Sequence, residues 1–333
     1  MKTIYILITF MLFSFFSCSN SEIEVPEVNN EKNLKNLGYS KLLKDSNYLN
    51  GFKLSSTNES NGNQHGVLDY GGTVNNPVWL VAQWNNLNND LLNAYYSKVS
   101  TMNTYETSGG FKVVSNTANG ELVLQVNASS EYGLNGITSN PRRMNEPWPT
   151  LLLEQSLSES DILKISDKEE IRMAIKYNVL FLIDKIPAGT FNPNLHSAQF
   201  QWFITVQNRN MSSPDYGRYI WFGLNFYDKR YDFPPLYAAQ DGGKEQNTGA
   251  FIYMPDMRNI MGSQGKTEIG KYMDINVDIL PIISEAFRLA QERNYLTNTT
   301  WNDLYIGATN IGWEVPGTYD VSVLIQSVNI LYR

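Results

Sequence analysis

Residues 219–227, Tyr-Ile-Trp-Phe-Gly-Leu-Asn-Phe-Tyr, carry the clearest indication of the fold class in this chain. Side chains alternate across a β-strand, so the even-numbered residues of this segment make one wholly apolar face. The odd-numbered residues on the other face are Tyr219, Trp221, Gly223, Asn225 and Tyr227. Residues 199–207 alternate in the same way between large apolar side chains and Gln, Phe or Thr. The two segments predict paired strands with one buried face and one uncharged face of rings and amides.

Short alternating runs, separated by Asn, Gly, Pro and Ser, continue on both sides of this pair. They predict strands over residues 79–83, 111–115, 121–127, 150–156, 171–184, 198–207, 218–227, 249–254, 271–277, 304–311 and 319–332. One amphipathic helix is predicted over 279–293, capped by Asp278 and with Pro281 in its first turn. The chain has no phosphate-binding glycine motif of a Rossmann or P-loop enzyme. We therefore predict an all-β fold, an antiparallel β-sandwich of the jelly-roll type.

Composition excludes several classes of site. The chain has 333 residues, a net charge of −7, 18% charged residues and 13% aromatic residues. The negative charge, without any basic block, argues against a nucleic-acid partner. One cysteine and two histidines leave too few ligands for a metal centre built from those residues. We predict no cofactor; the single candidate for calcium is Asp241 beside Gly242 and Gly243, which offer carboxylate and backbone oxygens.

The N-terminus has the pattern of an export signal. Lys2 precedes an apolar run over residues 4–16, which ends at Ser17 and Cys18 and is too short to span a bilayer. Cys18 stands where a lipobox places the cysteine that receives lipid. We predict a signal peptide over 1–17, a lipidated Cys18 with a polar tether over 18–63, and a single β-sandwich domain over 64–333.

The uncharged face predicts a sugar ligand. Aromatic rings cover the C–H faces of a sugar, and fixed amides pair with its hydroxyl groups. Two further tryptophans lie between turn residues, in Glu-Pro-Trp148-Pro and Gly-Trp313-Glu-Val-Pro, and a tryptophan in a loop is well placed at the rim of a site. The predicted ligand-binding residues are Trp148, Gln201, Tyr219, Trp221, Asn225, Tyr227 and Trp313.

The second possibility is a glycan-degrading enzyme on the same scaffold, either a glycoside hydrolase or a polysaccharide lyase. A glycoside hydrolase needs two carboxyl groups, for which the candidates are Glu154, Asp228 and Glu314. A polysaccharide lyase needs a base and an acid, for which His196 and Tyr219 are the candidates. Because the diagnostic catalytic strings of such enzymes are missing, binding is favoured over catalysis. The third possibility is a structural envelope lipoprotein whose aromatic residues are simply buried.

The lipobox, tether, aromatic-rich sandwich body and long closing strand over 319–332 together resemble a known protein class. The chain is similar to the lipid-anchored lipoproteins of Gram-negative glycan-utilisation systems, which carry a concanavalin-like or carbohydrate-binding-module-like jelly roll. The resemblance implies a glycan ligand and anchoring in the outer membrane at the cell surface or the periplasmic face, and it is compatible with bound calcium. It transfers no catalytic residue to this chain and names no protein partner.

Overall fold

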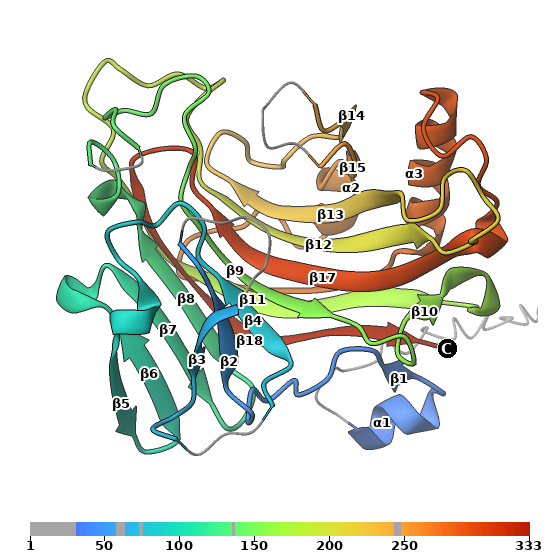
Figure 1. Cartoon of the computed structure of the whole chain (residues 1–333), viewed down its shortest axis with the longest axis horizontal. Coiled ribbons are helices and arrows are strands. Elements are labelled where there is room, and N and C mark those ends of the chain that lie inside the picture. Colours follow the sequence, from blue (N-terminus) through green and yellow to red (C-terminus); the bar gives the residue numbers. More distant parts are fainter. Residues whose placement is uncertain (1–30, 58–63, 73–75, 135–136, 243–247) are drawn as a thin grey trace, which may run out of the picture.

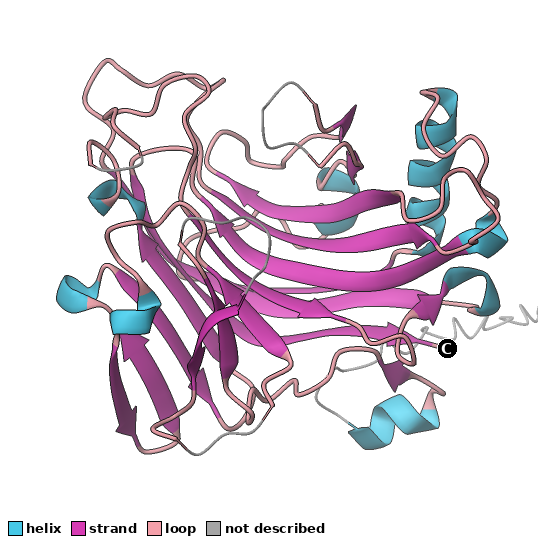
Figure 2. Ribbon diagram, in the orientation of Figure 1, coloured by secondary structure: helices cyan, strands magenta, loops and turns pink. Residues whose placement is uncertain are grey.

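The computed structural model describes residues 31–57, 64–72, 76–134, 137–242 and 248–333. The predicted signal peptide, Cys18 and the first part of the predicted tether lie outside these ranges. Two β-sheets pack face to face, and the few helices lie around their margins (Figures 1 and 2). The predicted all-β sandwich is thus confirmed. None of the helices in the described ranges has the length and hydrophobicity of a membrane span.

Sheet A has the strand order β16-β11-β18-β8-β7-β6-β5, and β1 also pairs with β18. Its long central pair is antiparallel and joins β11 to the closing strand β18. The strand bounds are β1 Ser40–Lys41, β5 Tyr95–Val99, β6 Met102–Glu106, β7 Lys112–Thr117, β8 Leu122–Asn127, β11 Ile171–Asp184, β16 Tyr272–Asp278 and β18 Tyr319–Tyr332.

Sheet B has the order β14-β15-β13-β12-β17-β9-β4-β2-β3, and β10 also pairs with β17. Its strands are β2 Phe52–Ser55, β3 Gln64–Leu68, β4 Trp79–Ala82, β9 Thr150–Ser156, β10 Leu163–Lys164, β12 Gln199–Asn208, β13 Tyr219–Asp228, β14 Tyr237–Gln240, β15 Phe251–Met254 and β17 Leu304–Glu314. Most pairs are antiparallel, as predicted, but β2 pairs with β4 and β13 pairs with β15 in parallel.

The core lies between the two sheets and contains many large rings. Each fully buried Phe or similar side chain contributes roughly 1.5–3 kcal/mol through removal of apolar surface from water. The apolar faces read from the alternation of residues 199–207 and 219–226 lie here. The largest fully buried aromatic side chains are Trp79, Trp202, Trp313, Tyr48, Tyr177, Tyr319, Phe52, Phe200, Phe222, Phe226 and Phe251.

The predicted late helix is confirmed as α3, Leu280–Glu292. Its N-terminus is held by Asp278, whose Oδ1 accepts a hydrogen bond from the Leu280 N–H at 3.0 Å. Pro281 lies in the first turn, where its missing N–H breaks no helical hydrogen bond. The buried face of α3 joins the main core and contacts β13. The shorter helices are α1 Glu31–Asn36, α2 Arg258–Met261, η1 Leu91–Asn93, η2 Ser108–Gly110, η3 Ala128–Ser130, η4 Ile165–Asp167 and η5 Trp301–Asp303.

The predicted tether, residues 18–63, extends too far toward the C-terminus. Residues 31–57 fold with the sandwich: β1 pairs with β18, and β2 pairs with β3 and β4. Leu34 packs with Tyr39 and Leu331 in a small cluster at sheet A. The polar composition of this stretch hid its apolar positions, which bury only after pairing with strands distant in the sequence.

Several strands were not predicted, and those at the sheet edges have a physical reason in common. β2, β3, β5, β6 and β14 are short, and β5 and β14 lie at sheet edges. An edge strand keeps much of its surface in water, so its sequence carries little alternation. In β5, Tyr95 and Val99 are exposed, and no residue of that strand is fully buried.

Candidate functional site

The outward face of sheet B, on the side away from sheet A, gathers most of the residues predicted to bind a ligand. Residues opposite each other on neighbouring strands point the same way, so the register defines rows across this face. One row consists of Gly223, Phe203, Asn310, Glu154 and Leu80. The next row consists of Asn225, Gln201, Gly312, Leu152 and Ala82. The strands that carry these rows curve side by side in Figure 1.

An aromatic cluster of Tyr219, Trp221 and Phe203 occupies the β13 side of the face. The ring centroids of Phe203 and Trp221 are 5.6 Å apart, and those of Trp221 and Tyr219 are 6.2 Å apart, both edge to face. The Phe203 ring lies where a Cβ at Gly223 would be, only 2.3 Å away, so glycine is required there. Trp221 and Tyr219 stay half-buried, which leaves ring surface on which a sugar can stack.

Two amides follow directly beside the aromatic cluster. Gln201 and Asn225 are paired across β12 and β13, and each side chain is 4% exposed. Within the described residues, the buried Oδ1 of Asn225 has no hydrogen-bond partner. A buried polar atom without a partner costs about 1–3 kcal/mol, and such atoms are typical of sites completed by water or ligand.

Glu154 is the carboxyl group nearest the middle of the face. It lies between Asn310 of β17 and Leu80 of β4. Burial raises the pKa of Glu154 to about 7, and this effect outweighs the hydrogen bond to Asn310, which lowers the pKa. The side chain therefore titrates near neutral pH, where a carboxyl group can both donate and accept a proton.

Trp148 and Glu314 lie at the end of the outward face where β9 begins and β17 ends. The Trp148 Nε1–H donates to Glu314 Oε2 at 3.2 Å. The Arg142 guanidinium lies over the Trp148 ring, 5.1 Å from the centroid. Trp148 is half-buried in the loop before β9, in agreement with its predicted place at the rim. Its orientation is fixed from two sides, so the ring is preorganised.

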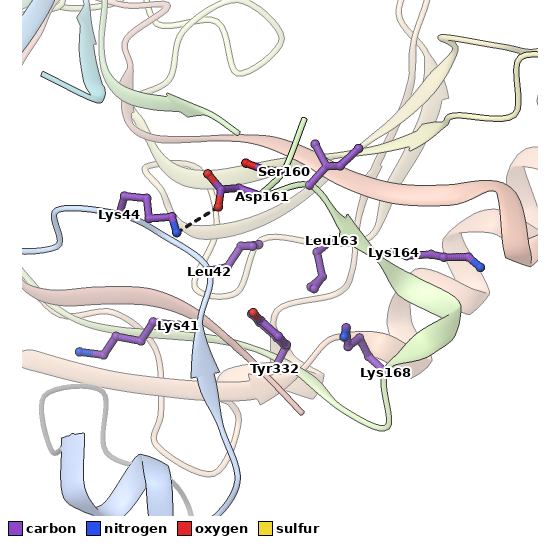
Figure 3. Close-up of a pocket in the computed structure, with 10 residues that line it drawn as sticks. Lys41, Leu42, Lys44, Ser160, Asp161, Leu163, Lys164, Lys168 and Tyr332 are labelled. Carbon is purple, nitrogen blue, oxygen red and sulfur yellow. Dashed lines mark ion pairs between the residues drawn. The ribbon is translucent and has the colours of Figure 1, made fainter. Parts of the chain in front are cut away.

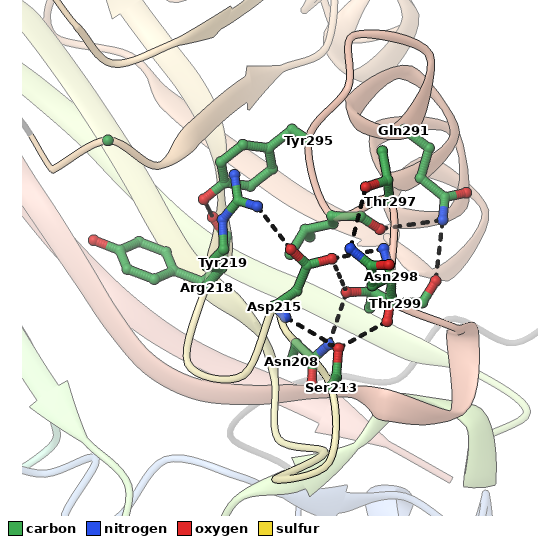
Figure 4. A network of polar contacts seen from close by, with 12 residues as sticks. Asn208, Ser213, Asp215, Arg218, Tyr219, Gln291, Tyr295, Thr297, Asn298 and Thr299 are labelled. Carbon is green, nitrogen blue, oxygen red and sulfur yellow. Dashed lines mark hydrogen bonds and ion pairs between the residues drawn. The ribbon is translucent and has the colours of Figure 1, made fainter.

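A polar network joins the loop before β13 to the segment that follows α3 (Figure 4). The buried Asp215 carboxylate accepts hydrogen bonds from the Asn298 N–H at 2.7 Å and from Arg218 Nη1 at 2.7 Å. The Arg218 guanidinium stacks over Tyr295, 4.1 Å from the ring centroid. The Tyr295 hydroxyl donates to the Tyr219 carbonyl at 3.0 Å, and the Tyr219 side chain extends away from the network. These bonds fix the backbone that presents Tyr219.

The prediction for Tyr227 is wrong because of a β-bulge. The register passes from Phe200 opposite Tyr227 to Gln201 opposite Asn225, which leaves Phe226 as an extra residue. The extra residue reverses the alternation, so Tyr227 turns to the core side. Its ring packs edge to face on Trp313 with centroids 6.3 Å apart.

The prediction for Trp313 as a rim residue is also wrong. β17 runs to Glu314, three residues past the predicted end, so Trp313 lies within a strand rather than a loop. It is fully buried, packs on Phe200 at 5.5 Å and donates its Nε1–H to the Leu124 carbonyl of sheet A. Trp313 is a core residue that joins the two sheets.

The three predicted carboxyl groups do not converge. Asp228 is 1% exposed and is tied to Arg230 Nη2 at 2.6 Å and Ser197 Oγ at 2.7 Å. Burial by itself raises the pKa of Asp228. The hydrogen bonds from Arg230 and Ser197, together with the charge of Arg230, lower the pKa by more than burial raises it, so Asp228 stays ionised. Glu314 is four residues along β17 from Asn310, which faces Glu154. The two backbone positions are therefore about 13 Å apart along the strand at ~3.3 Å per residue, a larger spacing than the ~9.5 Å between the carboxyl groups of an inverting pair.

His196 is a structural residue, so its prediction as a lyase base is wrong. The ring is 2% exposed. Nδ1 accepts from the Asn192 N–H at 3.0 Å, which leaves Nε2 as the donor to the Arg142 carbonyl at 2.9 Å. Both ring nitrogens are used to fasten two loops together. Tyr219, its predicted partner, lies at the other end of the outward face.

Surface pockets occur away from this face. One of about 300 Å³ lies between β1, β10 and the end of β18. In Figure 3 the Lys44 amine points to Asp161, at 3.0 Å, and the Lys41 amine points away from both. A second pocket, of about 340 Å³, is lined by Arg142 and His196 among other residues. Neither pocket is lined by Trp221, Gln201 or Glu154.

The described residues contain no group of three His, Cys, Asp or Glu side chains able to hold a metal ion. Asp241 uses Oδ2 to accept from both the N–H and the hydroxyl of Thr248, each at 2.8 Å. Gly243, part of the predicted calcium site, lies outside the described residues. Calcium binding at this loop stays a prediction.

Asn310, Phe203 and Trp84 belong to the face but were not predicted as site residues. Asn310 and Phe203 lie on predicted strands, and counting alternate positions would have found them. Trp84 follows β4, and the Thr150 N–H donates to its carbonyl at 3.0 Å, which extends the β4–β9 pairing by one step. Only that tertiary pairing shows that Trp84 belongs to this surface.

No protein-family model and no curated protein matches this chain. Solved structures with a similar fold include the family 12 xyloglucanase from Bacillus licheniformis, at 11% identity over 72% of this chain and 97% of that chain, with a TM-score of 0.41. Endoglucanase cel12A from Rhodothermus marinus is 10% identical over 72% and 96% of the two chains, with a TM-score of 0.36. The family 11 xylanase from Neocallimastix patriciarum is 8% identical over the same shares, with a TM-score of 0.35. These are jelly-roll glycoside hydrolases; the likeness is one of fold, and no residue role is carried over.

Proposed function

We propose that this protein binds an uncharged polysaccharide or oligosaccharide on the outward face of sheet B. The observation that carries the proposal is the contact between the Trp221 and Phe203 rings directly beside the buried amides Gln201 and Asn225. Rings and amides side by side match the alternating C–H and hydroxyl surfaces of a sugar.

The charges on the face support an uncharged ligand. The carboxyl groups of Glu154 and Glu314 lie on β9 and β17, among the amides. The lysines of neighbouring strands, Lys53 of β2 and Lys164 of β10, lie toward the margins. A polymer of uronic acids would place its carboxylates near Glu314 and, above about pH 7, near an ionised Glu154, which is unfavourable.

Trp221→Ala tests the proposal by affinity gel electrophoresis. The panel contains soluble β-glucan, xyloglucan, xylan, α-glucan and polygalacturonate. The wild-type protein should be retarded by at least one neutral polymer and not by polygalacturonate, and Trp221→Ala should lose that retardation with little change in Tm. Tyr95→Ala removes an 84% exposed ring on β5 of sheet A and is the matched control. Retardation that survives Trp221→Ala would refute the site.

A second candidate function, glycan hydrolysis, is favoured by one observation. The raised pKa of Glu154, about 7, suits a general acid that protonates a leaving oxygen. The same polysaccharide panel should then yield new reducing ends, and Glu154→Gln should abolish them while it preserves retardation. If wild-type protein releases no reducing ends from any polymer that it binds, the protein acts by binding alone.

Anchoring at the outer membrane through Cys18 is part of the proposal and is supported by the residue pattern of positions 2–18. A lipid linked to Cys18 would hold the sandwich close to the membrane surface on residues 19–30. The mass of the mature N-terminal peptide tests this point, and an unmodified N-terminus elsewhere in the chain would contradict it.

A further inference from the structure

We propose that the glycan runs diagonally across the outward face, from Trp221 to a second aromatic station formed by Trp84 and Trp148, and that the site therefore requires a chain of several sugar units. This inference rests on the proposed function. It adds Trp84 as a binding residue and gives the ligand a length and a direction.

Trp84 is placed on the outward face by the extension of strand pairing beyond β4. Leu80 and Ala82 face outward opposite Glu154 and Leu152, and Trp84 continues that alternation. The Thr150 N–H donates to the Trp84 carbonyl at 3.0 Å, so Trp84 lies at the level of Thr150. Its side chain is half-buried.

Trp84 and Trp148 approach the same residue of β9 from opposite directions. Trp148 lies two residues before Thr150 in the chain, and Trp84 lies beside Thr150 on the neighbouring strand. Asn85 Nδ2 donates to the Trp148 carbonyl at 3.1 Å, which joins the two segments. The Trp84 Nε1 is buried and has no hydrogen-bond partner among the described residues.

The separation of the two stations follows from the register. Trp221 pairs with Thr205 of β12, whereas Thr150 and Glu314 lie level with Gln199, six residues away on the same strand. Six residues span about 20 Å, and the four strand spacings from β13 to β4 span about 19 Å. The diagonal is therefore about 27 Å, far longer than one or two sugar rings.

The residues under this diagonal are small or carry amides, apart from Leu152, and they form a closely packed floor in which Leu152 is 3% and Gln201 4% exposed. Small residues, Gly312 and Ala82, lie in the row that it crosses. A Cβ at Gly312 would be 2.2 Å from the Leu151 carbonyl oxygen, so only glycine fits at this position. Gln201 and Asn310 lie beside the path and supply amides to sugar hydroxyl groups.

The test compares tri- and hexasaccharides of β-1,4-glucan, β-1,4-xylan and α-1,4-glucan by isothermal titration calorimetry. Wild-type protein should bind one of the hexasaccharides at least tenfold more tightly than its trisaccharide. Trp84→Ala should reduce hexasaccharide affinity to the trisaccharide level and leave trisaccharide affinity unchanged. Trp148→Ala, the second variant, should act in the same way if Trp84→Ala does not fold. Trp221→Ala should weaken both ligands, and Tyr95→Ala should change neither.

The outcomes separate this inference from the proposed function. If wild-type protein binds the two lengths equally, or if Trp84→Ala and Trp148→Ala keep full hexasaccharide affinity, the diagonal path is wrong and glycan binding at Trp221 stands. If none of these oligosaccharides and none of the neutral polymers binds, the proposed function fails and the inference fails with it.

Discussion

Glu154 shows how strand position changes the chemistry of a single residue. The sequence offers a carboxyl group at the end of Thr-Leu-Leu-Leu-Glu and gives no reason for an unusual pKa. In the fold, its neighbours across the sheet are Leu80 and Asn310, and the burial between them raises the pKa to about 7. A carboxyl group that changes charge near neutral pH is therefore a product of tertiary pairing.

We predict that Glu154→Gln stabilises the protein at high pH only. The pKa of Glu154 is above its usual 4.5, so the folded state holds the proton more tightly between pH 4.5 and 7. The free energy of unfolding therefore falls as the pH rises through that window, and the full penalty is present above pH 7. Urea unfolding should show Glu154→Gln more stable by about 3 kcal/mol at pH 8 and unchanged at pH 4. Glu106→Gln on β6 is the exposed control; equal effects at both pH values would refute the assignment.

At the element scale, small irregularities decide which side chains reach the face. The bulge at Phe226 turns Tyr227 inward, and three extra residues of β17 bury Trp313. Neither event changes the hydrophobic pattern enough to be read from the sequence. The effect on the side chains is nevertheless large, because a single inserted residue in a strand moves every later side chain to the opposite face. The helix α3 was predictable, since its pattern is local and its N-terminal Asp and Pro are local signals.

The loop before β13 gives a second prediction, for Asp215→Asn. Burial by itself raises the pKa of Asp215. The hydrogen bonds from Asn298, Arg218 and Thr299 lower the pKa by more than burial raises it, so the net shift is downward. Its stabilising effect is present above the usual pKa of 3.8 and is lost as the pH falls through the folded-state pKa. We expect Asp215→Asn to lower the free energy of unfolding by about 2–4 kcal/mol at pH 7, with the difference shrinking toward pH 2.

The control for this loop is Asp232→Asn, because Asp232 forms an exposed ion pair with Lys266 at 2.7 Å. Exposed pairs contribute about 0–1 kcal/mol, so that variant should be nearly neutral. A similar cost for both variants would show that the Asp215 network does not fix the start of β13.

At the scale of the whole molecule, buried residues tie the two sheets together. Lys112 of β7, in sheet A, is fully buried, and its Nζ donates to Gln83 Oε1 at 2.9 Å and to the Asn89 carbonyl. Gln83 follows β4 of sheet B, so this contact bridges the sandwich beside the segment that carries Trp84. Burial lowers the pKa of Lys112 to about 7, despite the attraction of Glu131 and Asp90.

Lys112→Met should remove a pH dependence of stability. The folded-state pKa of Lys112 lies below its usual 10.5, so the unfolded state binds more protons between pH 7 and 10.5, and stability rises with pH in that window. From pH 7 to pH 9 the wild-type protein should gain roughly 2 kcal/mol over Lys112→Met in urea unfolding. Lys98→Met, an exposed lysine of β5, should show no such gain. A constant difference between wild type and Lys112→Met would mean that Lys112 stays charged when buried.

Local sequence patterns were enough to predict the fold class, the positions of the long strands, the late helix, and the division of residues 199–207 and 219–225 into a core face and an amide and aromatic face. These follow from local periodicity, which survives because each strand buries one side. The three-dimensional structure was needed to show that Trp313, Tyr227, Asp228 and His196 are structural, that residues 31–57 belong to the sandwich, and that Trp84 reaches the face. Pairing between distant strands, bulges and burial set these outcomes, and none of them has a local signature in the chain.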